Sequence, residues 1–290
     1  MIYRQLSKYS LEELKDALFS IPSKNLLFAL IASFTGYVAL STYDYLALKY
    51  IDVKLPSWRW ILTGFVGFSV SNNAGHAIVS GGAVRYRFYS RWGISPGDIV
   101  KMVTFSGFTY LVACFFLIIL GYILTPEHAF GGNESTKVST FVTMILSLIG
   151  LCIYLWASIY YKKDLIIKGI DFKMPRFSLA LEQIFIGSLD ILMASLVLYF
   201  VLISFVEIDF FTFMGAFIIA QVLGVYSQVP GGLGVFELVF SNILPGQDNQ
   251  AILFGALVAY RIIYYLLPLI VSGFVLVIYE FFRNKKELAS

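Results

Sequence analysis

Long apolar runs separated by short polar loops cover almost the whole chain. The runs occupy residues 26–51, 60–80, 102–124, 138–161, 181–205, 210–228, 235–244 and 251–282. Most of them reach the ~20 residues that a helix needs to cross the hydrocarbon core of a bilayer. None shows the ~10-residue alternation that is typical of a membrane barrel strand. The pattern therefore predicts an all-α polytopic membrane protein with about seven or eight transmembrane helices.

Two of these runs do not fit an unbroken crossing. Residues 235–244 are too short, so they form either a half-helix or one arm of a re-entrant hairpin with the run before them. Pro268 predicts a kink in the last run, because proline lacks the amide that a helix needs. Composition agrees with the membrane class: 59% of the residues are hydrophobic, 13% are charged, and the mean hydropathy is +0.80.

The polar N-terminal segment reads as a separate element. Ser10 and Glu13 have the spacing of a capping box, and a leucine-rich stripe follows them. We therefore expect a cytoplasmic, interfacial amphipathic helix within residues 1–24, a transmembrane domain over residues 25–283 and a short cytoplasmic tail over residues 284–290.

Lysines and arginines predict the orientation, because cytoplasmic loops carry an excess of both. They gather in the N-terminal segment, in residues 85–101, in residues 162–176 and in the tail. This distribution predicts that both termini and both basic loops lie in the cytoplasm. Lys49, Lys54 and Arg59 do not fit, since they fall on the predicted outer side.

The sequence QVPGGLGVFE interrupts the apolar pattern between two runs. Its proline and glycines do not continue a stable helix, and broken backbone at membrane depth is tolerated only where protein or a water-filled cavity shields it. Unwinding would free amides at the start of the next helix, and such an end attracts anions. The substrate-binding residues predicted here are Gln228, Gly231, Gly232 and Gly234, with Pro230 as the structural break.

Arg261 stands apart from the other lysines and arginines, which lie in loops or near span ends. A charge at the bilayer centre costs about 2.5–3.5 kcal/mol, so its position needs a reason. Either Arg261 and Tyr264, on one helix face, line a hydrated cavity that binds a charged substrate, or Arg261 forms an interhelical ion pair. In the cavity alternative, the other polar residues of the runs also line the cavity and contact the substrate: Asp44, Asn72, Asn73, His76, Asp190, Gln221, Gln228 and Glu237. Glu237 is left open as substrate contact, ion-pair partner of Arg261 or helix cap.

A second glycine-interrupted segment, SNNAGHAIVSGGAVRYR, lies in the first half of the chain. Paired interrupted segments in two halves point to a transport site between repeats, so an inverted repeat is left open. Arg85, Arg87 and Arg91 alternate with aromatic residues, which suits a phosphate-bearing lipid headgroup. The alternative is ordinary anchoring by the positive-inside rule.

The sequence lacks the short motifs of several classes of enzyme and nucleotide-binding protein. It contains no nucleotide-binding loop, no HExxH, no Ser-His-Asp set and no dinucleotide fingerprint. We therefore predict a transporter-like protein without catalytic residues, metal ligands or cofactors. The basic stretches are too short to predict a nucleic-acid partner.

Three segments together resemble a known family: SNNAGHAIVSGGAVRYRFYSRWGIS, SQVPGGLGVFE and LVAYRIIYYLLPL. They are similar to the N-terminal membrane region of MprF, the bacterial lysylphosphatidylglycerol synthase and flippase, and to the wider flippase-like family that includes YbhN. The resemblance implies an inner-membrane protein that moves lysylphosphatidylglycerol to the outer leaflet and contributes to resistance to cationic antimicrobial peptides. The family's characteristic positions are Asn72, Asn73, Arg85, Arg87, Pro230, Gly231, Gly232, Gly234, Glu237 and Arg261.

The sequence ends at Ser290, before any acyltransferase domain of the kind that full-length members carry. The synthase activity is therefore not carried over, and the lipid is left open. Membrane phospholipids are the predicted partners; a separate aminoacyl-phosphatidylglycerol synthase and a homo-oligomer are left open. The rival hypotheses are a scaffold for such a synthase, a transporter of a polyprenyl-phosphate lipid, and an intramembrane enzyme that uses His76 with a carboxylate.

Overall fold

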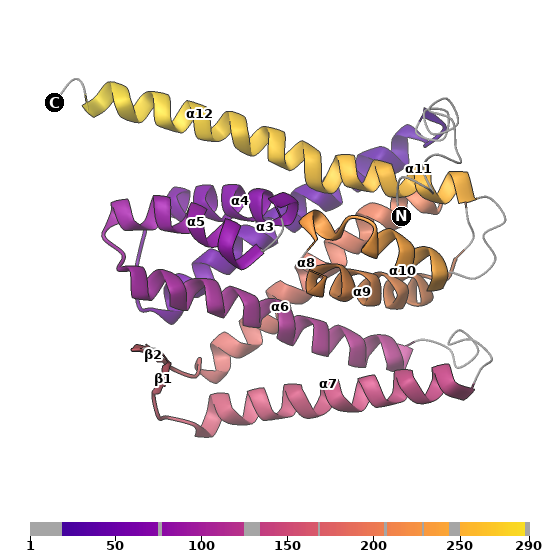
Figure 1. Ribbon diagram of the computed structural model, residues 1–290, viewed down its shortest axis with the longest axis horizontal. Coiled ribbons are helices and arrows are strands. Elements are labelled where there is room, and N and C mark those ends of the chain that lie inside the picture. The colour runs from indigo at the N-terminus through magenta and orange to yellow at the C-terminus, as the bar shows by residue number, and fades with distance from the viewer. Residues whose placement is uncertain are drawn as a thin grey trace.

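The computed structural model is a bundle of helices (Figure 1). It describes residues 19–74, 77–124, 134–167, 169–205, 208–227, 229–243 and 250–287. The long helices are α3 (Ser23–Tyr50), α6 (Pro96–Leu124), α7 (Glu134–Tyr160) and α8 (Phe177–Leu202), followed by α11 (Gln250–Arg261), a π-helical segment (Ile262–Leu266) and α12 (Leu267–Glu287). Five helical stretches in these ranges are long and apolar enough to cross a membrane, the last running through Gly255–Arg283. The prediction of a multi-pass helical membrane protein is therefore confirmed.

The first short helix pair turns back on itself. It consists of α4 (Ser57–Ala74) and α5 (Ala77–Tyr89). The ring of Trp92, just after α5, lies 5.6 Å from the ring of Trp58 in the first turn of α4, and 5.0 Å from the guanidinium of Arg59. Since the end of α5 returns to the start of α4, the pair is a hairpin. The prediction of one crossing helix over residues 60–80 is wrong.

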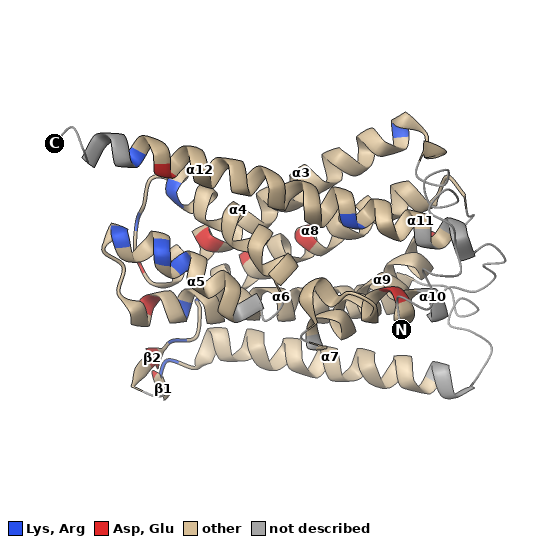
Figure 2. Ribbon diagram, turned by 45° about the horizontal axis from the view of Figure 1, so that its top comes forward, with Lys and Arg blue, Asp and Glu red and all other residues tan. Residues whose placement is uncertain are grey.

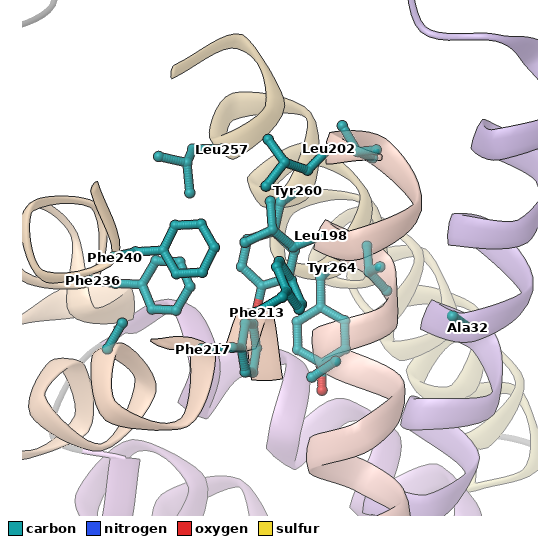
Figure 3. Close-up of a cluster of buried hydrophobic side chains, with 14 of the residues drawn as sticks. Ala32, Leu198, Leu202, Phe213, Phe217, Phe236, Phe240, Leu257, Tyr260 and Tyr264 are labelled. Atoms are coloured by element: carbon teal, nitrogen blue, oxygen red, sulfur yellow. The ribbon is translucent and has the colours of Figure 1, made fainter. Parts of the chain in front are cut away.

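The second short helix pair is also a hairpin. It consists of α9 (Phe210–Tyr226), the 3₁₀ turn η3 (Pro230–Gly232) and α10 (Val235–Ile243). Ring centroids of Phe213 and Phe240 lie 5.6 Å apart, and those of Phe217 and Phe236 lie 5.5 Å apart, which is an antiparallel pairing. Figure 3 shows these four rings packed together beside Tyr260. Of the two alternatives for residues 235–244, the structure has the hairpin arm.

Contacts between distant segments define the two ends of the bundle. At the first end Lys49 lies 2.7 Å from Glu182, and Arg87 lies 2.8 Å from Glu280. We call this the basic end; it carries the end of α3, the loops at residues 51–56, 90–95 and 161–176, and the end of α12. At the opposite end the side-chain amide of Asn25 donates to the hydroxyl of Ser204 at 2.7 Å. Figure 2 shows that most of the Lys and Arg of the described helices and loops gather at the basic end.

This arrangement corrects the predicted topology in two ways. Lys49, Lys54 and Arg59 lie at the basic end beside the other cations, so they are not exceptions. Helix α3 begins at the end of the bundle that lies opposite the basic end, and α12 ends at the basic end. The first and the last described helix termini therefore lie on opposite sides of the bundle. Of the surface helix predicted over residues 1–24, residues 1–18 lie outside the described residues, and Ser23 and Lys24 belong to α3.

The two hairpins enter the bundle from opposite ends. The α4–α5 hairpin starts and finishes at the basic end, next to residues 51–56 and 90–95. The α9–α10 hairpin follows the end of α8, where Ser204 contacts Asn25, and its second arm returns there. The end of α4 and the turn η3 therefore lie inside the bundle, away from both ends.

A small β hairpin departs from the predicted all-helical chain. Strands β1 (Leu165–Ile167) and β2 (Ile170–Phe172) pair antiparallel in the loop between α7 and α8. Lys101 at the start of α6 lies 2.8 Å from Asp171 on β2. This hydrogen bond holds the pKa of Asp171 below its usual value.

Candidate functional site

The turn of the second hairpin meets the end of α4 inside the bundle. Gly231 has φ +60°, and a Cβ added there would lie 3.3 Å from the carbonyl oxygen of Asn72. Gly232 has φ +62°, and its Cβ would lie 3.1 Å from the Cα of Gly224. Left-handed φ values and close backbone contacts both favour glycine. The glycines therefore allow the turn to pack between α9 and the end of α4.

Arg261 holds this turn in place. Its Nε donates to Oε1 of Glu237 at 2.8 Å, and its Nη1 donates to the carbonyl of Gly231. Nη2 lies 2.7 Å from the same Glu237 oxygen, but it is buried and outside hydrogen-bond geometry. The guanidinium also lies 4.5 Å from the centroid of the Tyr265 ring. Two helices and one hairpin turn are thus joined through one side chain.

Glu237 has two of the three roles that the sequence left open. It is the ion-pair partner of Arg261, and its Oε2 accepts from the backbone amide of Gly234 at 2.7 Å. The amides of Gly232 and Leu233 donate to Val229 and Pro230 at 2.8 and 3.1 Å. These three amides were expected to be free for an anion, and that expectation is wrong. The 3₁₀ turn that starts at Pro230 and the Glu237 cap satisfy them instead.

The π-helical segment after Arg261 exposes three successive carbonyls to the neighbouring helices. Ser33 and Tyr37 of α3 donate to Ile263 and Tyr264 at 3.1 and 3.0 Å, and Asn73 of α4 donates to Tyr265 at 3.2 Å. The carbonyl of Tyr264 is four residues before Pro268, whose missing amide leaves it without its helical donor. Side chains of neighbouring helices replace that donor, as membrane helices with proline require. The kink predicted at Pro268 is a π segment just before it.

Asp190 of α8 lies between two tyrosines. Its Oδ2 accepts from the Tyr43 hydroxyl at 3.1 Å and its Oδ1 from the Tyr264 hydroxyl at 3.2 Å. Tyr264 follows Arg261 by three residues, which links Asp190 to the hairpin turn. We call the whole set the central polar site: Tyr37, Tyr43, Asn72, Asn73, Asp190, Gly231, Gly232, Gly234, Glu237, Arg261 and Tyr264.

A second buried ion pair joins α3 to the first hairpin. Nε and Nη2 of Arg85 donate to Oδ1 of Asp44 at 2.9 and 2.7 Å, and the Tyr89 hydroxyl donates to Oδ2 at 2.8 Å. The side chains of Arg85 and Asp44 are 3% and 0% exposed. Gly81 makes room for this pair, since a Cβ there would lie 3.0 Å from Nη1 of Arg85.

The predicted cluster of Arg85, Arg87 and Arg91 is divided between two places. Arg85 is inside the bundle, whereas Arg87 and Arg91 contact Glu280 of α12 at the basic end, at 2.8 and 3.0 Å. The predicted site residues His76 and Gln228 lie outside the described residues. Pro230 opens η3, as expected of a structural break.

Sequence reasoning named Asp44 but missed the other polar residues on this face of α3. The buried polar residues Ser33, Tyr37, Ser41 and Asp44 repeat at three- or four-residue intervals along α3. This spacing places them on one face of a helix. The stripe was a readable signal for a polar interior face on the first span.

Fold and site define a class: a multi-pass membrane protein whose interior polar residues gather where the turn of one helical hairpin meets the end of a helix of the other. The chain belongs to the family of the lysylphosphatidylglycerol synthase transmembrane region, which residues 1–272 match. The family resemblance predicted from the sequence is therefore confirmed.

Three relatives show the range of this family. The chain is 31% identical to the uncharacterised protein slr0712 of Synechocystis over 99% of this chain and 89% of the relative. It is 26% identical to the inner membrane protein YbhN of Escherichia coli over 82% and 74%, respectively. It is also 29% identical to the phosphatidylglycerol lysyltransferase of Staphylococcus xylosus over 99% of this chain but 33% of that enzyme. The chain thus spans about a third of the lysyltransferases that it matches.

Proposed function

We propose that this protein moves a phosphate-bearing lipid, with lysylphosphatidylglycerol as the leading substrate, between the leaflets of the bacterial inner membrane. The observation that carries the proposal is the meeting of two hairpins, inserted from opposite ends, at Arg261 inside the bundle. Interrupted helices at the membrane midplane are the usual place for a transporter's substrate site.

The order of the elements supports an inverted repeat. In the first half, a long helix (α3), a hairpin (α4–α5) and a long helix (α6) follow one another. The second half has the same order in α8, α9–α10 and α11–α12. The first unit starts with α3 at the end away from the basic end, and the second starts with α8 at the basic end. The two units therefore run in opposite directions. Alternating exposure of a central site is the motion that such repeats support.

The chemistry of the central polar site suits a lysyl phospholipid. Arg261 carries a positive charge for the phosphate, and its Nη2 is buried without an aligned hydrogen bond. Glu237 carries a negative charge for the lysyl ammonium. In the structure Arg261 and Glu237 form an ion pair at 2.7 Å. A lysyl headgroup carries both charges, so its phosphate binds Arg261 and its ammonium binds Glu237 in place of that ion pair. Asn72 and Asn73, at the end of α4, add neutral hydrogen-bonding groups beside them.

The positive-inside rule supports placing the basic end in the cytoplasm. In that orientation α3 begins on the outer side, and α12 ends in the cytoplasm. Arg87, with 52% of its side chain exposed, then faces the anionic inner leaflet and is the first contact for a phosphate headgroup. The names of the lysyltransferase relatives support phosphatidylglycerol chemistry for the lipid, and the proposal extends to a share in resistance to cationic antimicrobial peptides.

The test is transbilayer movement in liposomes that contain the purified protein. Three fluorescent lipids are compared: lysylphosphatidylglycerol, phosphatidylglycerol and a polyprenyl phosphate. The proposal predicts that lysylphosphatidylglycerol equilibrates faster with protein than without it. Acceleration of the polyprenyl phosphate alone would reassign the substrate. No acceleration of any of the three, from protein shown to be folded by circular dichroism, contradicts transport and leaves the scaffold hypothesis.

A further inference from the structure

Three carboxylates of the described helices lie in the interior of the bundle, and one of them differs from the other two. Asp44 pairs with Arg85, and Glu237 pairs with Arg261. Asp190 is 4% exposed and forms no ion pair with any Lys, Arg or His of the described ranges. An isolated buried charge is far more costly than a paired one, and a carboxyl group avoids the cost by taking up a proton.

Among the residues that the structure describes, the surroundings of Asp190 hold ionisable groups but no cation. From α3 the groups that face it are Tyr37 and Tyr43; from α6, Tyr110 and Cys114; and from the π segment, Tyr264, whose ring packs against those of Tyr260 and Tyr265. Arg261 is near in sequence to Tyr264, but Glu237 and Gly231 already engage it. Of these neighbours, only Tyr43 and Tyr264 donate to the carboxyl group, so no neighbour supplies the charge that would hold it ionised.

The hydrogen-bond lengths also separate Asp190 from Asp44. The phenol of Tyr89 lies 2.8 Å from the arginine-paired Asp44. The phenols of Tyr43 and Tyr264 lie 3.1 and 3.2 Å from Asp190. Asp44 thus has a guanidinium and a phenol as donors, whereas Asp190 has two phenols, at longer distances.

We propose that Asp190 is the proton-binding site of the transport cycle, and that lipid movement is coupled to its protonation. This rests on the proposed function. When Asp190 is ionised, both phenols donate to it. When a proton from water forms an O–H bond at one carboxyl oxygen, that O–H becomes a donor, and one phenol must turn its own proton elsewhere.

The site has a direct route to the hairpin turn. Tyr264 lies on the π segment whose carbonyls bind Ser33, Tyr37 and Asn73. The same helix carries Arg261 one turn earlier, and Arg261 holds Gly231 and Glu237. A change in the hydrogen bonds of Tyr264 therefore acts on the segment that fixes the turn, which is how protonation reaches the lipid site.

The first experiment measures proton binding without transport. Infrared titration of the purified protein is compared between wild type, Asp190→Asn and Asp171→Asn, the last removing an exposed carboxylate on β2. We expect a protonated-carboxyl C=O band that titrates in wild type and in Asp171→Asn and is missing in Asp190→Asn. Tyr264→Phe keeps the carboxyl group and should shift the band. A titrating band that is unchanged in Asp190→Asn, or no such band in wild type, overturns the proposal.

The second experiment measures coupling in liposomes with the membrane potential clamped by potassium and valinomycin. One proton per lipid allows a pH step of one unit to drive up to about tenfold accumulation of lysylphosphatidylglycerol in one leaflet. Wild type should accumulate the lipid and lose the accumulation when a protonophore is added, whereas Asp190→Asn should only equilibrate it. Equilibration by wild type that ignores the pH step overturns the coupling. Absence of any lipid movement by wild type contradicts the proposed function instead, and the infrared titration then decides the proton site alone.

Discussion

The buried pair of Arg85 and Asp44 allows a quantitative test of the fold. Arg85→Met keeps most of the alkyl chain but removes the guanidinium, whose Nε and Nη2 lie 2.9 and 2.7 Å from Asp44. The hydroxyl of Tyr89 then remains as the one hydrogen-bond donor that the structure shows for the Asp44 carboxyl. With side chains 3% and 0% exposed, no water replaces the lost partner. Removing one member of such a pair costs about 3–5 kcal/mol, which is a large part of the stability of most proteins.

The assay is unfolding of the purified protein by sodium dodecyl sulfate in mixed micelles. Arg85→Met should lower the free energy of unfolding by about 3–5 kcal/mol, and Asp44→Asn combined with Arg85→Met should recover most of the loss, because no charge is left buried. Arg176→Met, at the exposed N-cap of α8, should change it by less than about 0.5 kcal/mol. Equal losses in the single and the double variant would refute the reasoning.

Two further predictions concern the second hairpin and the orientation. Gly232→Ala should lower the thermal unfolding midpoint, through about 1–3 kcal/mol of strain, because its Cβ would lie 3.1 Å from Gly224 and its φ is +62°. Gly215→Ala, whose Cβ would have nothing within 4 Å, should not lower the midpoint. A Gly232→Ala midpoint equal to that of wild type would show that the turn is not packed as described. In a cysteine-free background, a membrane-impermeant maleimide added to intact cells should label Lys24→Cys but not Lys54→Cys; the reverse pattern contradicts a cytoplasmic basic end.

The spans and the glycine break were predictable from the sequence because both are local signals. Apolar runs marked the long helices to within a few residues at most ends, and Pro230 with the following glycines marked the turn of the second hairpin. The pairing of Arg261 with a carboxylate was one of two alternatives, because spacing along the chain does not show which carboxylate is near. The structure selects Glu237, 24 residues away.

The first hairpin was not predicted: residues 60–80 read as one apolar run and residues 85–93 as a basic loop, although residues 71–87 were recognised as a glycine-interrupted segment. The signal lay in charge: Lys49, Lys54 and Arg59 violated the predicted orientation. If residues 57–89 form a hairpin and not a crossing helix, these three cations lie at the basic end with the others. Their apparent violation of the positive-inside rule was therefore evidence for the hairpin. The partnership of Asp44 with Arg85 depends on that same turn, which is why pattern alone did not bring them together.

The most direct test of the central polar site is the initial rate of lysylphosphatidylglycerol movement in liposomes with three proteins. Wild type and Arg176→Gln should accelerate the lipid equally. Arg261→Gln combined with Glu237→Gln keeps the shape of the pair without leaving a charge unpaired, and it should reduce the rate to that of liposomes without protein. A folded double variant that moves the lipid as fast as wild type would contradict the account.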